Sequence, residues 1–500
     1  MTQSRGRKIR CAVFAVVAAT AMTAAAQTFQ KLASFDGSNG ALPYYMSLVQ
    51  GTNGKLYGTT FDGGASCVSG EGCGTVFEIT PRAKLTTLYK FFCQPSDCTD
   101  GQFLYSGLTL ATDGNFYGVT ESGGLWRCAF GCGTVFKITP RGKLTTLYKF
   151  CQLSNCTDGS SPSAPLVEAA DGNFYGTTEG GGTGGGGTIF KINTNRKLST
   201  LYNFCGSCSP GVGALVQGQD GSFYGTADDI NGYGIIFKIT PKGKLTTLYA
   251  FCSQPKCTGA TFSQSTLLLA SDGNLYGTTP VGGADNCGLY LGGGCGTVFK
   301  LTPSGKFTTL YTFCVQRSCA DGATPWAGLI QATDGTLYGT TSEGGNSGSP
   351  KCEAQVIGCG TVFKITTTGS LTTLYRFDSP TDGWQPTGGL LQATNGDFYG
   401  TTEYGGNAGG YGTVFSLSTG LKPFAAFVRS YGKVGQAAGI LGQGFIGTTS
   451  VLFDGIPAKF VVVYDTFIKA TVPRGATNGY VTVSTPRGTL KSNVRFHIIR

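Results

Sequence analysis

The stretch DGNFYGTTEGGG, from Asp171 to Gly182, decides the fold because it returns along the chain. Near-copies begin at Asp113, Asp272 and Asp334, and looser ones at Asn53, Asp220 and Asn395. Its Gly-rich end resembles a loop that cradles a phosphate after a strand. It lacks the Lys-Ser/Thr of a P-loop and no helical pattern follows, so a phosphate site is disfavoured. A residue set that occurs seven times is more typical of architecture than of an active site.

The composition is that of an all-β protein with a large core. Of the 500 residues, 81 are Gly, 40% are hydrophobic and only 13% are charged. Glycine at this frequency, with many Thr and aromatic residues, is typical of short strands joined by tight turns. No window has the period of a long amphipathic helix.

Residues 1–26 have the features of a secretory signal peptide. Four basic residues precede an apolar run, and Ala24-Ala25-Ala26 fits a cleavage site that leaves Gln27 as the new N-terminus. The run is short for a retained membrane anchor, and no later stretch is long and apolar enough to span a bilayer. We therefore expect a protein that is secreted or held in the cell envelope, without a membrane span after signal removal.

The charge gives little support to nucleic-acid binding. The formal net charge is +10. Loss of the signal segment removes four positive residues and leaves about +6. So small an excess on a long, exported chain predicts no nucleic-acid partner.

Cysteine usage predicts disulfides. Of the 19 Cys, Cys11 lies in the signal segment and the other 18 form nine close pairs. Five pairs follow the recurring LYxF motif: Cys93 with Cys98, Cys151 with Cys156, Cys205 with Cys208, Cys252 with Cys257, and Cys314 with Cys319. Four pairs precede GTVF: Cys67 with Cys73, Cys128 with Cys132, Cys287 with Cys295, and Cys352 with Cys359. An even number of locally paired Cys in an exported chain predicts nine within-loop disulfides.

Two other interpretations of the cysteines are weaker. Zinc sites built from Cys gather four ligands, whereas these pairs are assigned to different repeats, so no metal site is expected. Cys205-Gly-Ser-Cys208 is a CxxC sequence, which allows a redox role. A loop staple is favoured because the same position carries wider-spaced pairs in four other repeats.

The copies align as seven units between Asp36 and Gly420. Each unit has an apolar strand, an Asp-Gly or Asn-Gly turn, the NFYGTT strand, a Gly-rich loop, and the strands GTVFKIT and LTTLYKF. Asp-Gly and Asn-Gly supply the positive φ that two-residue hairpin turns require. The second-strand Tyr recurs at Tyr57, Tyr117, Tyr175, Tyr224, Tyr276, Tyr338 and Tyr399, and the third-strand Phe at Phe77, Phe136, Phe190, Phe237, Phe299, Phe363 and Phe415.

Such a four-stranded sheet has two partly apolar faces that it cannot bury alone. Stacking the copies around an axis buries both faces, so residues 27–420 are predicted to form a seven-bladed β-propeller. The motif LTTLY occurs six times, and the seventh unit lacks it. Residues Thr28–Phe35 have the right pattern and are predicted to pair with Gly412–Leu417, which closes the ring.

The motifs DGNFYGTT, GTVFKIT and LTTLYxF resemble the GloVer-type tandem repeats of choice-of-anchor proteins, over residues 28–420. This resemblance implies a secreted or surface protein and assigns no activity. The chain departs from the family pattern because we expect no C-terminal anchor in it.

Residues 421–500 are expected to form a second domain, because the period stops after Gly420 and Cys disappears. Short alternating strands are joined by turns at Asp454-Gly455 and Asn478-Gly479. The segment resembles an IPT/TIG domain, an immunoglobulin-like β-sandwich. The resemblance rests on Gly442-Gln443-Gly444-Phe445, Val472-Pro473 and Thr485-Pro486-Arg487-Gly488. It implies a spacer or an adhesive module.

Candidate ligand residues fall on the propeller face that carries the loops between strands two and three and between strands four and one. Acids recur there after YGTT, at Asp62, Glu121, Glu179, Asp228, Glu343 and Glu403. Trp126, Trp326 and Trp384 lie in loops on the same face. The acids are interpreted either as solvated loop residues or as a ring that binds a cation or a glycan. The Trp side chains are either ligand contacts or loop cores.

No catalytic constellation stands out. The single His, His497, lies in the second domain, which excludes a multi-His metal site within one chain and disfavours Ser-His or Cys-His catalysis. The leading hypothesis is a secreted, non-catalytic binding or scaffold protein without a cofactor, which binds a polysaccharide or a surface protein on its loop face. The alternative is a glycan-active hydrolase or lyase that uses loop carboxylates. A purely structural envelope protein is a third possibility.

Overall fold

The computed structural model describes residues 27–65, 72–93, 98–128, 131–205, 213–228, 234–251, 265–283, 294–345, 358–377 and 381–499. The expected signal peptide, residues 1–26, lies outside the described residues. The described chain is all-β apart from two short 3-10 turns, η1 (Ser154–Cys156) and η2 (Arg317–Cys319). None of its helices is long and apolar enough to cross a membrane.

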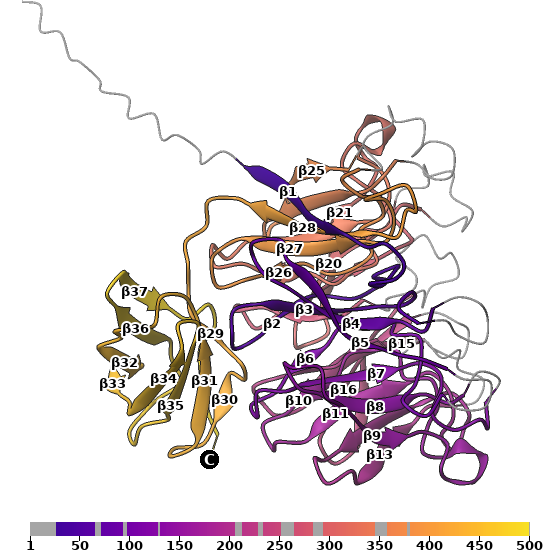
Figure 1. The fold of residues 1–500 in the computed structure, drawn as a ribbon, viewed down its shortest axis with the longest axis horizontal. Helices are drawn as coiled ribbons and strands as arrows, with labels where there is room; N and C mark the ends of the chain where they lie inside the picture. The colour runs from indigo at the N-terminus through magenta and orange to yellow at the C-terminus, as the bar shows by residue number, and fades with distance from the viewer. Residues whose placement is uncertain are drawn as a thin grey trace, which may run out of the picture.

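Six four-stranded antiparallel sheets are each built from consecutive strands (Figure 1). Sheet 1 contains β2 (Val49–Gln50), β3 (Leu56–Thr60), β4 (Thr75–Ile79) and β5 (Leu85–Lys90). Sheet 2 contains β6 (Thr109–Leu110), β7 (Phe116–Thr120), β8 (Thr134–Ile138) and β9 (Leu144–Lys149). Sheet 3 contains β10 (Val167–Glu168), β11 (Phe174–Thr178), β12 (Thr188–Ile192) and β13 (Leu198–Asn203).

The next three sheets repeat this order. Sheet 4 contains β14 (Val216–Gln217), β15 (Phe223–Asp228), β16 (Gly234–Ile239) and β17 (Leu245–Ala250). Sheet 5 contains β18 (Leu268–Leu269), β19 (Leu275–Thr279), β20 (Thr297–Leu301) and β21 (Phe307–Thr312). Sheet 6 contains β22 (Ile330–Gln331), β23 (Leu337–Thr341), β24 (Thr361–Ile365) and β25 (Leu371–Arg376).

Sheet 7 joins the two ends of the repeat region. It contains β26 (Leu391–Gln392), β27 (Phe398–Thr402), β28 (Thr413–Ser418) and β1 (Thr28–Ser34). β1 runs antiparallel to β28, with Thr28 opposite Ser418 and Ser34 opposite Thr413 (Figure 1). The prediction that the N-terminal strand completes the last sheet is therefore confirmed.

The recurring Tyr-Gly pair is explained by packing within each sheet. In sheet 3, Gly176 of β11 lies opposite Phe190 of β12. A Cβ atom on Gly176 would lie 2.6 Å from the Phe190 ring, so only glycine leaves room for that ring. The side chain of Tyr175 points to the neighbouring sheet, where it packs 4.2 Å from Phe223, measured between ring centroids. One dipeptide thus serves both the inside of a sheet and its contact with the next.

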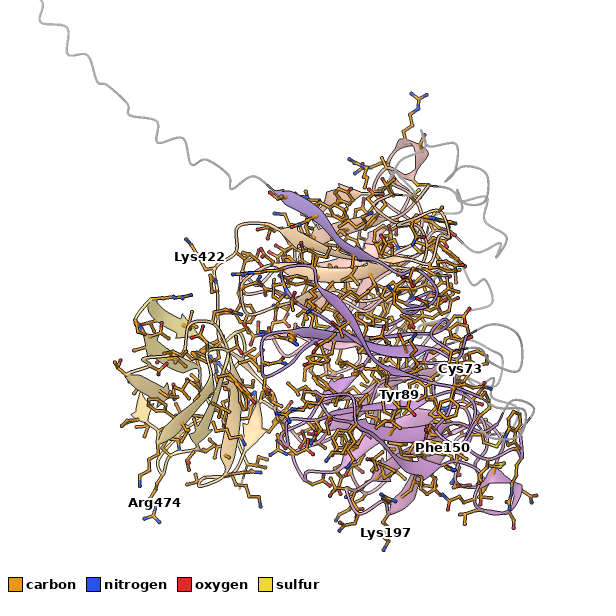
Figure 2. The ribbon with its side chains drawn as sticks, in the orientation of Figure 1. Cys73, Tyr89, Phe150, Lys197, Lys422 and Arg474 are labelled. Atoms are coloured by element: carbon orange, nitrogen blue, oxygen red, sulfur yellow. A yellow bond between two sulfur atoms is a disulfide. The ribbon has the colours of Figure 1, made fainter. Side chains whose placement is uncertain are left out.

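Neighbouring sheets share continuous apolar cores, and the last sheet also packs on the first. Leu32, Phe35 and Val414 of sheet 7 belong to the same buried cluster as Leu56 and Phe77 of sheet 1. Figure 2 shows the side chains filling the space between the sheets, while Lys197 and Lys422 extend outward. Every sheet therefore has two packed neighbours.

The C-terminal unit, residues 424–499, has a core of its own. One sheet has the order β29 (Ala426–Phe427), β31 (Ala437–Leu441), β35 (Phe467–Thr471) and β34 (Phe460–Tyr464). A second has the order β33 (Ile456–Pro457), β32 (Ser450–Phe453), β36 (Val481–Thr485) and β37 (Gly488–Lys491), and β30 (Tyr431–Gly432) pairs with β38 (His497–Ile498). Ile440, Phe445 and Val483 are buried among these strands.

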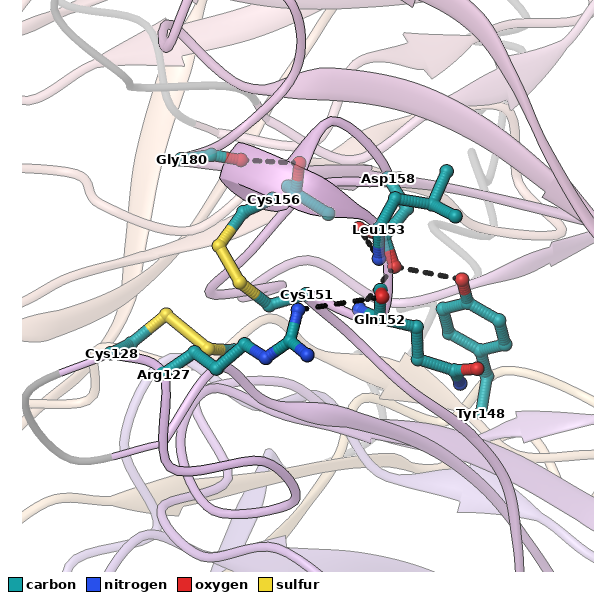
Figure 3. The surroundings of a disulfide bond; sticks show 11 residues. Arg127, Cys128, Tyr148, Cys151, Gln152, Leu153, Cys156, Asp158 and Gly180 are labelled. Atoms are coloured by element: carbon teal, nitrogen blue, oxygen red, sulfur yellow. Dashed lines mark hydrogen bonds between the residues drawn. A yellow bond between two sulfur atoms is a disulfide. The ribbon is translucent and has the colours of Figure 1, made fainter.

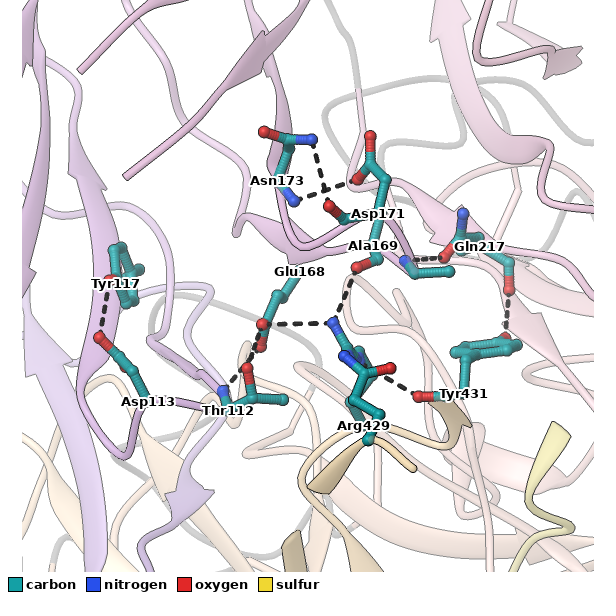
Figure 4. A network of polar contacts seen from close by, with 12 residues as sticks. Thr112, Asp113, Tyr117, Glu168, Ala169, Asp171, Asn173, Gln217, Arg429 and Tyr431 are labelled. Carbon is teal, nitrogen blue, oxygen red and sulfur yellow. Dashed lines mark hydrogen bonds and ion pairs between the residues drawn. The ribbon is translucent and has the colours of Figure 1, made fainter. Parts of the chain in front are cut away.

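The C-terminal unit packs on the turn face, defined as the side with the turns between the first and second strands of sheets 1–7. Thr466 donates a hydrogen bond of 2.8 Å to the Thr52 carbonyl, and Gln443 donates one of 2.9 Å to the Thr394 hydroxyl. Figure 4 shows Arg429 beside Glu168, with 3.6 Å between Nη1 and Oε1. Both side chains are almost fully buried. The unit is thus held against the repeat region by specific polar contacts.

Candidate functional site

A pocket of about 320 Å³ lies where the seven sheets meet. Each sheet contributes the segment that leads into its first strand. One lining residue from each of sheets 1–7 is, in order, Tyr45, Tyr105, Ser163, Gly213, Ser265, Trp326 and Thr387. These segments approach from the side opposite the turn face, which we call the loop face. The pocket therefore opens on the loop face, away from the C-terminal unit.

Aromatic rings form one part of the pocket wall. Tyr45 and Trp326 pack edge to face, with 5.6 Å between ring centroids. The ring centroid of Tyr105 lies 4.7 Å from that of Phe61 and 5.7 Å from that of Tyr44. Such rings offer flat apolar area that costs little conformational entropy when a ligand binds.

Two glutamates, Glu121 and Glu179, form another part of the wall. Each directly follows the second strand of its sheet, β7 or β11. The Ser163 hydroxyl donates a hydrogen bond to the Glu179 carboxylate. Glu403 occupies the same position after β27 and is only 6% exposed.

The neighbouring loops fix where these glutamates lie. The Glu179 amide donates to the Ser161 carbonyl at 3.0 Å, and the Ser161 amide donates to the Cys132 carbonyl at 2.9 Å. Ser161 has a φ of 55°, a left-handed conformation that is uncommon for residues other than glycine. The disulfide-bonded loop of sheet 2 thus orders the segment that positions an acid of sheet 3.

Burial changes the acidity of these carboxyls. Burial, with a smaller contribution from the charge of Glu179, raises the pKa of Glu121 to about 7. Burial also raises the pKa of Glu403 to about 7, against the opposing hydrogen bond with Tyr404. Burial raises the pKa of Glu179 as well, opposed by the Ser163 hydroxyl. With a pKa of about 7, Glu121 and Glu403 exchange protons at neutral pH and can both donate and accept hydrogen bonds.

The same carboxyls influence Tyr105. Burial raises the pKa of the Tyr105 phenol to about 12, and Glu121, Glu179 and Glu403 add to this effect. Tyr105 therefore keeps its proton and can donate a hydrogen bond throughout the physiological pH range. Of these three carboxyls, Glu121 and Glu179 line the pocket together with Tyr105.

The residues predicted for the ligand face have different surroundings in the structure. Glu121, Glu179 and Trp326 line the pocket. Glu343 instead accepts a 3.0 Å hydrogen bond from Thr324, and Asp62 accepts one of 2.6 Å from the amide of Gly63.

Trp384 and Trp126 lie outside the pocket lining, in different surroundings. Trp384 stacks on Tyr404, with 4.7 Å between ring centroids, and acts as loop core. Trp126 is 46% exposed. The three Trp residues thus do not form one exposed patch.

Of the four recurring glutamates, Glu403 is buried, and Glu121, Glu179 and Glu343 are partly buried. Burial raises the pKa of Glu343 as it does for Glu121, Glu179 and Glu403. The pocket tyrosines, Tyr45 and Tyr105, were not predicted from the sequence. The pocket residues share one position in the repeat, just before the first strand of each sheet. Their residue types differ from sheet to sheet, so only this position could have predicted them.

Four of the predicted disulfides join described residues: Cys93 with Cys98, Cys128 with Cys132, Cys151 with Cys156, and Cys314 with Cys319. Cys73, Cys205, Cys295 and Cys359 are also disulfide-bonded. Their predicted partners Cys67, Cys208, Cys287 and Cys352 lie outside the described residues, as do both Cys252 and Cys257.

The repeats match a known family model over residues 1–229 and 209–349. The chain belongs to the Gloeobacter/Verrucomicrobia repeat family. Together the matched segments span more than half of the 500 residues. No curated protein matches the chain.

Several solved structures are distantly similar to this chain. One is the extracellular domain of a protein assigned as a hybrid two-component system from Bacteroides thetaiotaomicron, with 10% identity and a TM-score of 0.47. The alignment covers 95% of this chain but only 59% of that one. Another is an aldose sugar dehydrogenase from Streptomyces coelicolor, with 12% identity, a TM-score of 0.39, and coverage of 79% and 98%. Likenesses at this level say nothing of what the chain binds.

Proposed function

We propose that this is an exported protein in which the seven sheets are the blades of a seven-bladed β-propeller, with a C-terminal sandwich of the IPT/TIG type. It binds a glycan, without catalysis, in the pocket at the centre of the loop face. One observation carries this proposal. The pocket combines aromatic rings with proton-bearing carboxyls and hydroxyls, and all seven sheets contribute to it.

This mixture of groups fits a sugar. The C–H face of a sugar ring packs on aromatic side chains such as Trp326 and Tyr105, and its hydroxyls need partners that both donate and accept hydrogen bonds. Carboxyls with a pKa near 7, such as Glu121, provide such partners without the full cost of a buried charge. A concave pocket of about 320 Å³ suits one or two sugar rings better than the flat surface of a protein partner.

Calorimetric titration with a panel of oligosaccharides tests the proposal. For an oligosaccharide that binds, Trp326→Ala is expected to weaken binding by roughly 30-fold, because it removes about 2 kcal/mol of buried aromatic contact. Trp126→Ala is the matched control, since this Trp is exposed and lies outside the pocket lining. Loss of binding in Trp126→Ala with full affinity in Trp326→Ala would place the ligand elsewhere.

A second candidate function, glycan hydrolysis, is favoured by the position of Glu121 beside Glu179. A carboxyl with a raised pKa next to a second carboxyl is the arrangement of a general acid and its partner in glycoside hydrolases. If the pair is catalytic, Glu121→Gln retains oligosaccharide binding but loses the release of reducing ends. If the wild-type protein releases none from any bound glycan, the non-catalytic proposal stands.

Export has its own test. The cysteine usage and the features of residues 1–26 support it. N-terminal sequencing of the protein recovered outside the cytoplasm is expected to begin at Gln27. A chain that retains Met1 and stays in the cytoplasm would contradict the proposal.

A further inference from the structure

Two disulfides of sheet 2 lie side by side (Figure 3). One joins Cys128 to Cys132 in the connection between β7 and β8, and the other joins Cys151 to Cys156 after β9. The four Sγ atoms all lie within 4.8 Å of one another. The expectation that cysteine pairs stay apart on different repeats is wrong here, because two pairs of one repeat meet.

The loops that carry these sulfurs are held by contacts other than the disulfides. Asp158, which is 1% exposed, accepts hydrogen bonds from the Tyr148 hydroxyl at 2.7 Å, the Gln152 amide at 2.9 Å and the Leu153 amide at 3.2 Å (Figure 3). Arg127 donates a hydrogen bond of 3.4 Å to the Gln152 carbonyl and so connects the two loops. These contacts order the loop after β9 and join it to the loop of Cys128 independently of the S–S bonds.

The same gathering occurs in sheet 5. The Sγ atoms of Cys295, Cys314 and Cys319 lie within 4.8 Å of one another, and all three residues are buried. Repetition at the equivalent place of a second repeat argues against a chance meeting in sheet 2.

We propose that Cys128, Cys132, Cys151 and Cys156 bind one zinc ion when both disulfides are reduced. Thiolate sulfur is a preferred zinc ligand, and a tetrahedral site with Zn–S bonds of about 2.3 Å places its sulfurs about 3.8 Å apart. In the oxidised cluster all four sulfurs lie within 4.8 Å of one another and two pairs are joined by S–S bonds, so only the sulfurs within each pair have to move apart to reach that spacing. The oxidised, metal-free form and the reduced, zinc-bound form are two states of one site.

The chemistry balances with a dithiol as the named reductant. Each disulfide takes two electrons and two protons from one dithiol, which becomes a cyclic disulfide, and two thiols are formed. Two dithiols thus yield four thiols. Zinc then replaces the four thiol protons, which are released to solvent, so binding depends on pH.

The distribution of cysteines supplies matched variants. Sheets 1, 2 and 5 each carry a pair before the third strand and a pair after the fourth, so the chain offers three sets of four. Sheet 3 carries only the pair Cys205 and Cys208, since the connection between β11 and β12 has no Cys. The four Cys of sheet 2 are therefore expected to bind one metal ion, and the single pair of sheet 3 provides a matched control.

Cobalt titration of the reduced, full-length protein under anaerobic conditions tests this proposal. Cobalt bound to four thiolates has intense visible absorption bands, which zinc abolishes on displacement. Cys128→Ser with Cys132→Ser is expected to lower the stoichiometry by one ion, whereas Cys205→Ser with Cys208→Ser leaves it unchanged. Far-ultraviolet circular dichroism of each oxidised variant checks its fold, and Cys151→Ser with Cys156→Ser serves as a second variant of the same site. A reduced wild-type protein without these bands, or equal stoichiometry in all variants, would overturn the proposal.

Discussion

Acids near the two ends of the second strand have opposite surroundings. On the turn face, four aspartates form ion pairs with a lysine of the third strand: Asp113 with Lys137, Asp171 with Lys191, Asp220 with Lys238, and Asp272 with Lys300, at 2.6–3.3 Å. On the loop face, Glu121, Glu179 and Glu403 form no ion pair with any lysine or arginine that the structure describes.

Their acidities differ accordingly. Partial burial acts to raise the pKa of Asp113, but hydrogen bonds from Lys137 and Asn115 outweigh it and hold the pKa below its ordinary value. Burial of Glu121 and Glu403 meets no such cation and raises their pKa values to about 7. An acid that recurs with its cation is part of the architecture, whereas a buried acid without one is a candidate for function.

Glu168 differs from both groups of acids, because it lies on the turn face, is buried and is paired with an arginine. At its position, sheets 1, 4, 6 and 7 carry a glutamine whose side-chain oxygen accepts from a backbone amide of the neighbouring sheet: Gln50, Gln217, Gln331 and Gln392. Glu168 makes the same bond, accepting from the Thr112 amide at 2.8 Å, and also pairs with Arg429. Glu168 thus places a charge at this position of sheet 3, one of several sheets that the C-terminal unit contacts.

The largest expected effect follows from breaking that pair. Glu168→Ala leaves the Arg429 cation buried without its partner, so the free energy of unfolding is expected to fall by about 3–5 kcal/mol. Urea denaturation measures the loss. Gln331→Ala, which removes a neutral hydrogen bond at the same position of sheet 6, is expected to cost about 1 kcal/mol. Equal losses in the two variants would show that the charge of Glu168 is unimportant.

The next effect depends on pH. The pKa of Glu403 is raised in the folded state from 4.5 to about 7, so its contribution to stability is complete below pH 4.5 and is lost as the pH rises through about 7. Glu403→Gln is therefore expected to be more stable than wild type at pH 8.5, by at most about 3 kcal/mol, and similar to it near pH 4. Thermal unfolding at both pH values checks this. A difference that does not change with pH would exclude titration of Glu403 as its cause.

A smaller effect separates the two causes of the Glu121 shift. Glu179→Gln removes the nearby charge but leaves the burial of Glu121, which is the larger cause. The pKa of Glu121 is expected to fall by less than about one pH unit and to stay above 4.5. Carbon-13 NMR titration of labelled Glu side chains measures it. A return to the ordinary value would make the charge of Glu179, rather than burial, the dominant cause.

The smallest effect is expected on the turn face. Lys137 and Asp113 are both about one-third exposed, so Lys137→Met is expected to lower the free energy of unfolding by less than about 1 kcal/mol. The loss should shrink further in high salt, because salt screens exposed charges. Urea denaturation at low and high salt tests both points. A loss as large as that of Glu168→Ala would remove the distinction between exposed and buried pairs.

Much of the repeat region was predictable from local patterns. Asp-Gly and Asn-Gly turns predicted the hairpins. The missing seventh LTTLY predicted that Thr28–Phe35 pairs with Gly412–Leu417, and the observed ladder joins Thr28–Ser34 to Thr413–Ser418. The turns depend on residues that are neighbours in sequence, and the closure depends on one sheet that lacks a fourth strand. Because the repeats are near-copies, both features could be recognised in a single chain.

The pocket and the docking of the C-terminal unit could not be predicted from local sequence patterns. Tyr45, Tyr105 and Trp326 meet only after seven distant segments converge, and their identities follow no repeat. The burial of Glu179 depends on the left-handed Ser161, whose conformation has no residue signature. Arg429 meets Glu168 across about 260 residues of sequence, a contact that no local pattern encodes.

The pairing of β1 with β28 affects the order in which the sheets can form as the chain is synthesised. Its partner β28 is synthesised about 380 residues later, so at 5–20 residues per second β1 waits roughly 20–80 s for it. Sheets 1–6 can form as their own strands appear, since each is built from consecutive segments. During this interval the alternating segment Thr28–Ser34 has no place in any sheet and remains available to other strand edges. Sheet 7 can therefore close only after the strands of sheets 1–6 have been synthesised, and any chain that stops before Thr413 keeps that segment without its partner.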